Sequence, residues 1–375
     1  MRLNLIRFFT FGGIMTSWTY LSIFASQSGI PDSQIGLIVA FYSLALFLSS
    51  FVFGRASDRF GRKLFLLIGL ALSGIAFFLQ IFAHDIITLL LVRSFVGFCL
   101  GIYPAALVAY VHENKKSLAK FSSFGSLGWG VGTIAGGLIA VYFTIRAVFL
   151  LSSVLFIFAL TAAFGIKFKK HDAVDVPKFP IEVAKRNLSL YLSILIRHSG
   201  AHMIWTFWPL FLQSLGADLF WIGVIQLTNS LTQFVIMFIL GGRLSYISSI
   251  IVGLTLSSVS FFSFTLASDF WQILPTQILL GISWSLIYVG GLRYLMDRNI
   301  ERATASGLFD SVLSLSSIIG PFMATLVVAF GGYRVTMYFA AIFAIVGALL
   351  FRFSKQHASV GHLNLNNVGK NNNNK

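Results

Sequence analysis

The sequence predicts an all-α membrane protein with twelve transmembrane helices in two six-helix halves. Three observations lead to this prediction. First, 57% of the 375 residues are hydrophobic and 10% are charged, whereas soluble domains carry about 25% charged residues. Second, the chain contains twelve apolar runs, each near the ~20 residues that a helix needs to cross a bilayer core. Third, the two halves repeat one another at nearly constant spacing.

Each apolar run is expected to be a helix, because a lone strand in lipid cannot satisfy its backbone hydrogen-bonding groups. In chain order the runs lie at residues 5–27, 34–56, 63–83, 86–111, 122–143, 146–166, 189–213, 220–241, 247–267, 270–294, 303–330 and 333–353. The longest hydrophilic stretch between runs divides them six and six. The predicted parts are an N-terminal bundle at 1–166, a linker at 167–188, a C-terminal bundle at 189–353 and a disordered tail at 354–375.

The basic residues predict the orientation. With the N-terminus inside, the outer loops hold Arg146 and Arg334, and the spans hold Arg93 and Arg197. The remaining 23 of the 27 lysines and arginines, Arg7 among them, are assigned to inner segments. Inner loops of membrane proteins carry an excess of Lys and Arg. We therefore expect a multi-pass protein of the cell membrane with both termini and the linker cytoplasmic. This topology accounts for the net charge of +15 without nucleic acid.

The two halves repeat in the same orientation. A shift of 187 residues aligns Trp18 with Trp205, and a shift of 184 residues aligns Arg93 with Gln277. Six spans return the chain to its starting side of the membrane, so the two repeats are parallel.

A charged loop at residues 54–63 separates the second and third runs. It reads Gly-Arg-Ala-Ser-Asp-Arg-Phe-Gly-Arg-Lys, and the flanking stretches 35–53 and 64–83 contain no charged residue. The loop resembles the signature of the major facilitator superfamily, in which Asp-Arg follows a glycine and Gly-Arg-Lys follows after one residue. The resemblance covers residues 1–353. It implies a secondary transporter that works by alternating access, with its site near the midplane between two parallel halves.

Two further segments carry the resemblance. Arg93, Gly97 and Gly101, spaced by four residues in the fourth run, are similar to the basic motif of that family. The glycine-rich segment 128–137 in the fifth run resembles the motif associated with antiporters, with Thr133 in place of the usual proline. Because of this departure, the choice between symport and antiport is left open.

The resemblance implies that the 54–63 loop latches the two halves together in one conformer. Asp58 is expected at the N-terminus of span eleven, near Ala303, where the helix macrodipole stabilises an exposed carboxylate by roughly 0.3–1 kcal/mol. Arg62 could pair with Glu113 at the inner end of span four. The alternative is that the basic residues only hold the loop inside. The predicted latch residues are Gly54, Asp58, Arg59, Gly61, Arg62 and Glu113.

Polar and aromatic side chains inside the spans form the candidate substrate and coupling set. A charge within a membrane span is a functional candidate, and histidine titrates near neutral pH, which suits a proton relay. The alternatives are structural: a histidine bonded within the bundle, a packed aromatic ring, or an amide that joins two helices. The candidates are Arg93, Arg197, His198, His202, Trp205, Gln226, Asn229, Gln277, Trp284 and Asp310.

Arg197 and Asp310 are expected to pair. Both lie roughly 10–12 Å from the inner side at 1.5 Å per residue, and a pair at matching depth avoids two unpaired buried charges. Two interpretations stay open: a permanent structural pair, or a pair in which Asp310 exchanges its partner for a proton. Since Arg93, Arg197 and Asp310 sum to +1, a neutral or anionic substrate is expected.

The sequence gives no support to several other functions. His198 and His202 share a helix face but have no apparent third metal ligand. The chain lacks a nucleotide-binding Gly-x4-Gly-Lys-Ser/Thr loop. We expect no cofactor, no metal and no enzymatic activity, but a monomeric transporter of a small organic solute, with protons as a candidate coupling ion. The competing hypothesis is a non-transporting membrane sensor or scaffold that keeps the fold.

Overall fold

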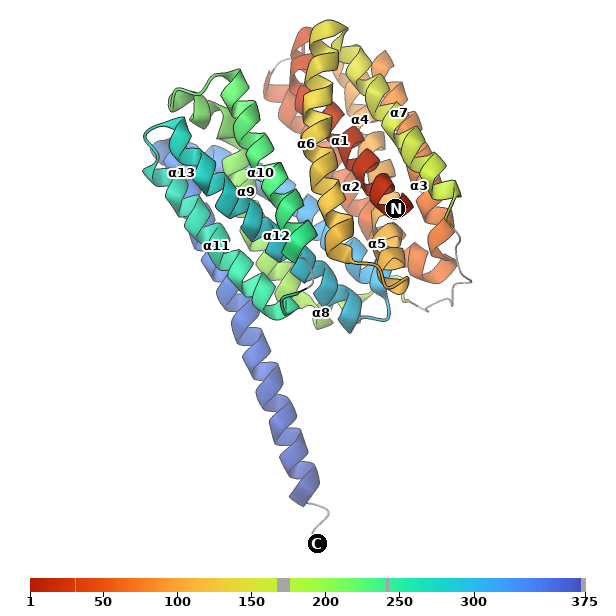
Figure 1. Cartoon of the computed structure of the whole chain (residues 1–375), viewed down its shortest axis with the longest axis vertical. Coiled ribbons are helices and arrows are strands. Elements are labelled where there is room, and N and C mark those ends of the chain that lie inside the picture. The colour runs from red at the N-terminus through yellow and green to blue at the C-terminus, as the bar shows by residue number, and fades with distance from the viewer. Residues whose placement is uncertain (31, 167–175, 241–242, 372–375) are drawn as a thin grey trace.

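The computed structural model describes residues 1–30, 32–166, 176–240 and 243–371. Within these ranges every regular element is a helix. Figure 1 shows the helices in two groups, with α1 to α7 in one and α9 to α13 in the other. The all-α membrane fold predicted from composition is confirmed.

The first half contains seven α-helices and one short 3₁₀ helix. They are α1 (Arg2–Gln27), α2 (Asp32–Phe60), α3 (Arg62–Leu79), η1 (Gln80–Phe82), α4 (Ile86–Ile102), α5 (Pro104–Glu113), α6 (Leu118–Tyr142) and α7 (Ile145–Phe164). The fourth expected span is therefore two helices. The break lies at Tyr103, because Pro104 cannot donate a backbone hydrogen bond and its ring clashes with a preceding carbonyl.

The linker contains a short helix that the sequence did not predict, and the second half follows it. In chain order the elements are α8 (Ile181–Arg186), α9 (Leu188–Ser214), α10 (Leu219–Leu240), α11 (Tyr246–Leu266), η2 (Phe270–Gln272), α12 (Ile273–Arg298) and α13 (Arg302–Asn371). Two expected spans lie within α13, which is interrupted at Gly331 and Gly332. Gly332 has φ of 72°, a conformation that favours glycine. The disorder expected for the tail at 354–375 stays a prediction.

Ten segments among the described residues are long and apolar enough to cross a membrane. The helices α1 and α9, of 26 and 27 residues, supply the other two expected spans. The apolar sequence of α9 contains polar side chains at Arg197, His198 and His202. Large apolar side chains such as Leu91 and Leu138 are exposed. Apolar surface of this extent is typical of helices that face lipid.

Glycine residues bring α1 and α6 into backbone contact. A Cβ atom on Gly128 would lie 2.2 Å from the carbonyl oxygen of Phe8, and one on Gly132 would lie 2.3 Å from that of Gly12. Helices associate in lipid through such close packing, because lipid tails are as apolar as the side chains.

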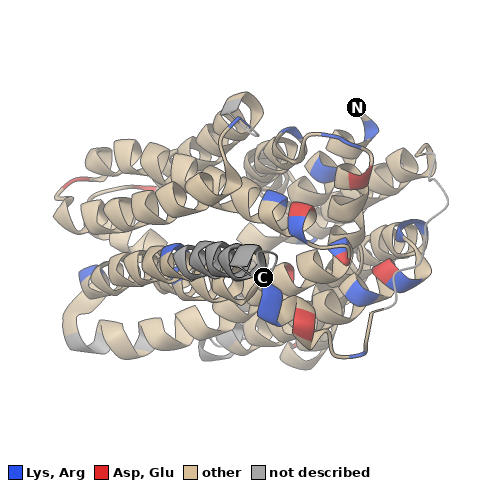
Figure 2. Ribbon diagram, turned by 90° about the horizontal axis from the view of Figure 1, so that it is seen from below, with Lys and Arg blue, Asp and Glu red and all other residues tan. Residues whose placement is uncertain are grey.

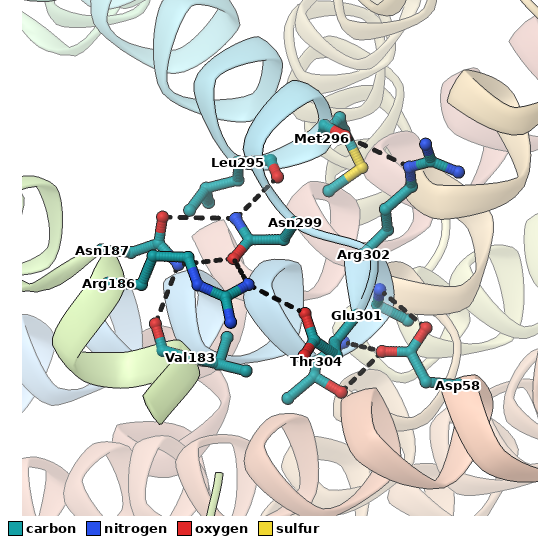
Figure 3. Close-up of polar contacts among 11 residues, drawn as sticks. Asp58, Val183, Arg186, Asn187, Leu295, Met296, Asn299, Glu301, Arg302 and Thr304 are labelled. Atoms are coloured by element: carbon teal, nitrogen blue, oxygen red, sulfur yellow. Dashed lines mark hydrogen bonds and ion pairs between the residues drawn. The ribbon is translucent and has the colours of Figure 1, made fainter. Parts of the chain in front are cut away.

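The linker is fastened to both halves. Nε of Arg55, at the end of α2, donates to the backbone carbonyls of residues 176 and 177 at 2.9 and 2.7 Å. At the other end of the linker, the amides of Asn187 and Asn299 exchange hydrogen bonds of 2.9 and 3.2 Å (Figure 3). We call this end of the bundle the linker end and the opposite one the far end. Figure 2 looks onto the linker end and shows charged residues on its loops and helix ends.

The buried apolar core is shared by the two halves near the linker end and divided at the far end. The largest cluster combines Leu107 and Phe121 of the first half with Leu295 and Phe309 of the second. At the far end each half has its own cluster, which includes Phe24 and Phe149 in the first half and Trp208 and Phe264 in the second. The halves are therefore packed together at the linker end.

Candidate functional site

Asp58, near the end of α2, reaches the first turn of α13. Its carboxylate accepts hydrogen bonds from the backbone N–H groups of Ala303 at 3.2 Å and Thr304 at 2.6 Å (Figure 3). The hydroxyl of Thr304 donates a third bond of 2.5 Å. The first N–H groups of a helix lack intrahelical partners and carry the positive end of its dipole, so they stabilise a buried carboxylate. The expected contact between Asp58 and Ala303 is thus present, and it joins the two halves.

Arg62 connects Asp58 to Glu113 within the first half. Its Nη1 lies 2.6 Å from Oδ1 of Asp58, and its Nη2 lies 2.8 Å from Oε1 of Glu113. Gly61 precedes α3 with φ of 101°, a left-handed backbone that allows the sharp turn between α2 and α3. Arg59 is exposed and contacts the ring of Phe60, so the structure places it beside the latch and not in its contact with the second half.

Gly54 makes a very close approach to the second half. A Cβ atom on Gly54 would lie 2.7 Å from the carbonyl oxygen of Ala303 and 2.9 Å from Cα of Gly307. A Cβ atom on Gly307 would lie 2.5 Å from the carbonyl oxygen of Ser50. The contact between α2 and α13 therefore requires glycine on both sides.

Other polar contacts between the halves extend from the linker end to the middle of the helices. At the linker end, Nε2 of His112 lies 3.7 Å from Oδ1 of Asp297. Further along, the hydroxyl of Ser317 on α13 donates to that of Ser43 on α2 at 3.0 Å. These contacts describe a conformer that is closed at the linker end.

Four candidate residues come together within the second half. Nε of Arg197 donates to the hydroxyl of Ser257 at 2.9 Å, and its guanidinium carbon lies 5.1 Å from the ring centroid of Trp284. The ring of His198 stacks on Trp284, with centroids 4.9 Å apart and an angle of 21° between planes. His202 stands edge-on to His198 at 4.9 Å. His198, His202 and Trp284 are partly exposed.

Trp205 joins a neighbouring aromatic group instead. Its ring lies 5.3 Å from that of Trp208, which in turn packs on Phe264 at 4.8 Å. In the described part of the chain, no three His, Cys, Asp or Glu side chains are grouped as in a metal site.

The expected ion pair between Arg197 and Asp310 is wrong for this structure. Arg197 points toward α11 and α12, where Ser257 and Trp284 contact it. The charged group that acts electrostatically on Asp310 is Arg7 on α1. Arg197 and Asp310 were expected at the same depth in the membrane, but depth gives only the position of a residue along its helix. It does not give the face of the helix from which the side chain projects.

Arg7 is a residue that the sequence interpretation missed. It was assigned to an inner segment, but the structure places it within α1 with 3% of its side chain exposed. Its Nη2 donates to the hydroxyl of Tyr288 on α12 at 2.6 Å, across the interface between the halves. The available signal was its position inside the apolar run at 5–27, where a charge is unusual.

Arg93 lies within the first half and is 1% exposed. Its Nη1 donates to the hydroxyl of Ser17 at 3.2 Å and to Oε1 of Gln80 at 3.3 Å. The rings of Tyr42 and Trp18 lie 4.6 and 5.7 Å from its guanidinium carbon. The structure does not bring Arg93 into contact with the candidate residues of the second half.

Among the amide candidates, Asn229 takes part in hydrogen bonds between helices, and Gln277 contributes its backbone carbonyl while its side-chain amide is buried without a partner. Nδ2 of Asn229 donates to the backbone carbonyl of Gln277 at 3.1 Å, and Nε2 of Gln233 donates to Oδ1 of Asn229 at 2.6 Å. The hydroxyl of Ser126 on α6 donates to Gln233 at 3.2 Å, which links these hydrogen bonds to the first half. The structure does not bring the side chain of Gln226 into this group.

A comparison with known protein families identifies the fold and the function of the chain that makes these contacts. The sequence profile described as Major Facilitator Superfamily matches residues 3–188 and 190–367. The chain belongs to this superfamily. As a major facilitator protein it is a multi-pass membrane protein that moves small solutes by secondary transport. The findings give no support to the alternative of a sensor or scaffold.

Individual major facilitator proteins resemble the chain over most of its length. The multidrug resistance protein MdtG of Proteus mirabilis (strain HI4320) is 26% identical over 89% of this chain and 90% of the relative. An uncharacterized MFS-type transporter of Methanocaldococcus jannaschii, MJ1560, is 26% identical over 88% and 91%. The human organic anion transporter MFSD10 (TETRAN) superimposes with a TM-score of 0.70 at 15% identity, over 93% of this chain and 96% of that one. This last likeness shows the fold alone.

Proposed function

We propose that this transporter moves a neutral or anionic organic solute across the cell membrane as a monomer, with both termini and the linker cytoplasmic. The balance of buried charge carries the proposal on the substrate. Arg7, Arg93 and Arg197 are 3%, 1% and 3% exposed, and they outnumber Asp310. Charge of one sign in a site of low dielectric attracts the opposite sign and repels its own, so an organic cation fits this set poorly.

In this proposal an organic ring of the substrate binds beside His198 and Trp284 in the second half. The rings of His198 and Trp284 are stacked and partly exposed, and the guanidinium of Arg197 lies over the ring of Trp284. Transporters bind substrate near the midplane between their repeats. The MdtG relatives are named multidrug resistance proteins, and a drug-sized compound with a planar ring suits such a surface.

Protons are the proposed coupling ion, and Asp310 is the proposed proton acceptor. It is a partly exposed carboxyl in α13 and lies within electrostatic reach of the first half. An acid at membrane depth marks the path of substrate or ion by default. If the linker end is cytoplasmic, the conformer described above is closed to the cytoplasm. In the proposed cycle of alternating access, the contacts of the 54–63 loop hold this conformer and break when the linker end opens.

The topology is tested by labelling single cysteines after Cys99, which is buried, is replaced by alanine. Ser268 between α11 and η2, and Lys178 in the linker, are both exposed. We expect Ser268→Cys to react with an impermeant reagent added outside intact cells, and Lys178→Cys to react only after the inner face is opened. The reverse pattern would overturn the orientation.

Transport by the proposed surface is tested in proteoliposomes with a panel of neutral, anionic and cationic ring compounds. We expect neutral and anionic compounds to cross faster than cations of similar size. Trp284→Ala is expected to lower their uptake by roughly two- to tenfold, because an aromatic contact contributes about 0.5–1.5 kcal/mol beyond its buried area.

Trp271→Ala is the matched control. Trp271 is half exposed and contacts Trp221 at the far end of the second half, so its removal is expected to leave uptake unchanged. Equal uptake by the two variants would mean that Trp284 is not part of the substrate site. Faster transport of cations than of neutral or anionic compounds would contradict the proposed substrate class. Binding of a compound without any flux would favour a sensor.

A further inference from the structure

Arg93 lies where four helical elements of the first half meet. It is about two turns into α4. Its Nη1 donates to Ser17 on α1 and to Gln80 in η1, and the ring of Tyr42 on α2 lies 4.6 Å from its guanidinium carbon. All four side chains are buried. Since every element of this group belongs to the first half, the group moves as one body with that half.

The positive charge of Arg93 has no acidic partner in the described part of the chain. The ion pairs of the described residues join other groups, and none includes Arg93. The acid that precedes it, Asp85, caps the start of α4 and accepts a hydrogen bond from the backbone N–H of Thr88. A charge buried without a counter-charge is strongly unfavourable, and the neighbouring aromatic rings offset only part of this cost. A negative charge beside Arg93 is therefore favoured.

Two buried N–H donors of this group lack a hydrogen-bond partner. They are Nε of Arg93 and Nε2 of Gln80. Two acceptors of the group, the hydroxyl oxygen of Ser17 and Oε1 of Gln80, already receive Nη1 of Arg93. A water molecule brings two donors of its own and needs acceptors for them, whereas an anion only accepts. The donors left over in this group therefore match an anion.

The packing around Arg93 restricts the size of that anion. One turn after Arg93, a Cβ atom on Gly97 would lie 2.3 Å from the carbonyl oxygen of Tyr42, so α4 and α2 are in backbone contact. The ring of Trp18 lies 5.7 Å from the guanidinium carbon and 5.3 Å from the ring of Tyr42. Trp18 is partly exposed and stands between Arg93 and the surface of the first half. Such an enclosed position suits a single-atom anion and not an organic acid.

We propose that Arg93 and Gln80 bind a chloride ion inside the first half. Nε of Arg93 and Nε2 of Gln80 donate to the ion, which supplies the negative charge that the neighbouring side chains lack. The ion holds α4 to η1 and, through the bond of Arg93 to Ser17, to α1. It stabilises the first half in every conformer and is not carried by the transport cycle. The proposed substrate class does not depend on this site, since the other buried arginines still outnumber Asp310.

The test follows the melting temperature of the purified full-length transporter while sodium gluconate is replaced by sodium chloride at constant ionic strength. A ligand of the folded state raises stability by mass action. Wild type is expected to melt roughly 2–6 °C higher in chloride, with a saturating dependence on its concentration. Bromide, a halide of similar size, is expected to replace chloride. An unchanged melting temperature in chloride would overturn the proposal.

Three variants locate the ion. Gln80→Glu places a carboxylate beside Arg93, so it is expected to be as stable in gluconate as wild type is in chloride and to lose the response to chloride. Arg93→Met removes the cation and is also expected to lose the response. Gln80→Leu keeps the cation and removes one donor. It is expected to weaken the affinity for chloride about tenfold or more, and it replaces Arg93→Met if that variant does not fold.

Arg146→Met is the matched control. Arg146 is exposed and donates to the backbone carbonyl of Ile81, next to Gln80. Its removal takes an arginine from the same end of the first half and leaves the buried group in place, so the full response to chloride is expected. If the variants of Arg93 and Gln80 respond as wild type does, chloride acts elsewhere and the site is overturned. Loss of the response in Arg146→Met alone would place the ion at the surface and would overturn it as well.

Discussion

Asp58→Asn is expected to open the linker end and to lower transport at least tenfold, while the yield of folded protein falls much less. The carboxylate accepts three hydrogen bonds from the first turn of α13, and a hydrogen bond to a charged group contributes about 1.5–3 kcal/mol. Loss of that charge destabilises the conformer closed at the linker end. Within the first half it removes one partner of Arg62, which keeps its ion pair with Glu113. Flux in proteoliposomes measures the loss of transport. The distance between spin labels on Lys116 and Ile300, exposed residues of opposite halves at the linker end, measures the opening in protein that lacks Cys99.

Arg59→Gln supplies the control for Asp58→Asn. It removes a charge from the same loop, but from an exposed side chain that contacts Phe60 in the first half. We expect wild-type flux and wild-type label distances. Normal flux and unchanged conformer populations in Asp58→Asn would reduce the loop to a signal for membrane topology.

Gly54→Val is expected to prevent the linker end from closing. The added side chain would begin 2.7 Å from the carbonyl oxygen of Ala303 and 2.9 Å from Cα of Gly307, and both neighbours are backbone atoms that cannot turn aside. Overpacking of this kind costs typically 1–3 kcal/mol, which shifts the population at least several-fold toward the open conformer. The label distance at the linker end should lengthen, and flux should fall about tenfold or more.

Gly97→Val is the comparison that separates conformational change from folding. Its Cβ atom would lie 2.3 Å from the carbonyl oxygen of Tyr42, a contact inside the first half that every conformer keeps. We expect this variant to lower the thermal stability and the folded yield. Gly54→Val could instead lose as much folded protein as Gly97→Val does, with normal label distances in the protein that remains. That result would mean that the close approach of α2 to α13 is needed for folding and not for the transport cycle.

The contact of Asp58 with the start of span eleven was expected from the resemblance to the major facilitator superfamily, whereas the role of the loop as a latch stays a prediction. A loop between two apolar runs must lie at a membrane surface, and the N-terminus of a helix is the place that accepts a carboxylate. The resemblance named the partner helix, and the helix dipole supplied the physical reason for the contact. The contacts of Asp58 with Ala303 and Thr304 bear out that geometry.

Contacts inside the membrane were predicted less well, because they depend on the direction in which each helix faces. The rise of 1.5 Å per residue gives depth from sequence alone, and it placed Arg197 and Asp310 at one level. Which face of each helix meets which neighbour is set by packing of whole bundles. Arg7 was missed for a different reason: a basic residue near a helix end was taken as an orientation signal, although it lies in the apolar run.

The bonds that fasten the linker limit how far the transporter can open. Arg55 holds residues 176 and 177 to the first half, and the short helix α8 ends in the Asn187–Asn299 pair of the second. Between residue 177 and Ile181, where α8 begins, the chain has four peptide links, which reach at most about 14 Å when fully extended. While both fastenings hold, the linker acts as a tether of fixed length. A wider swing of the two halves must first release Arg55.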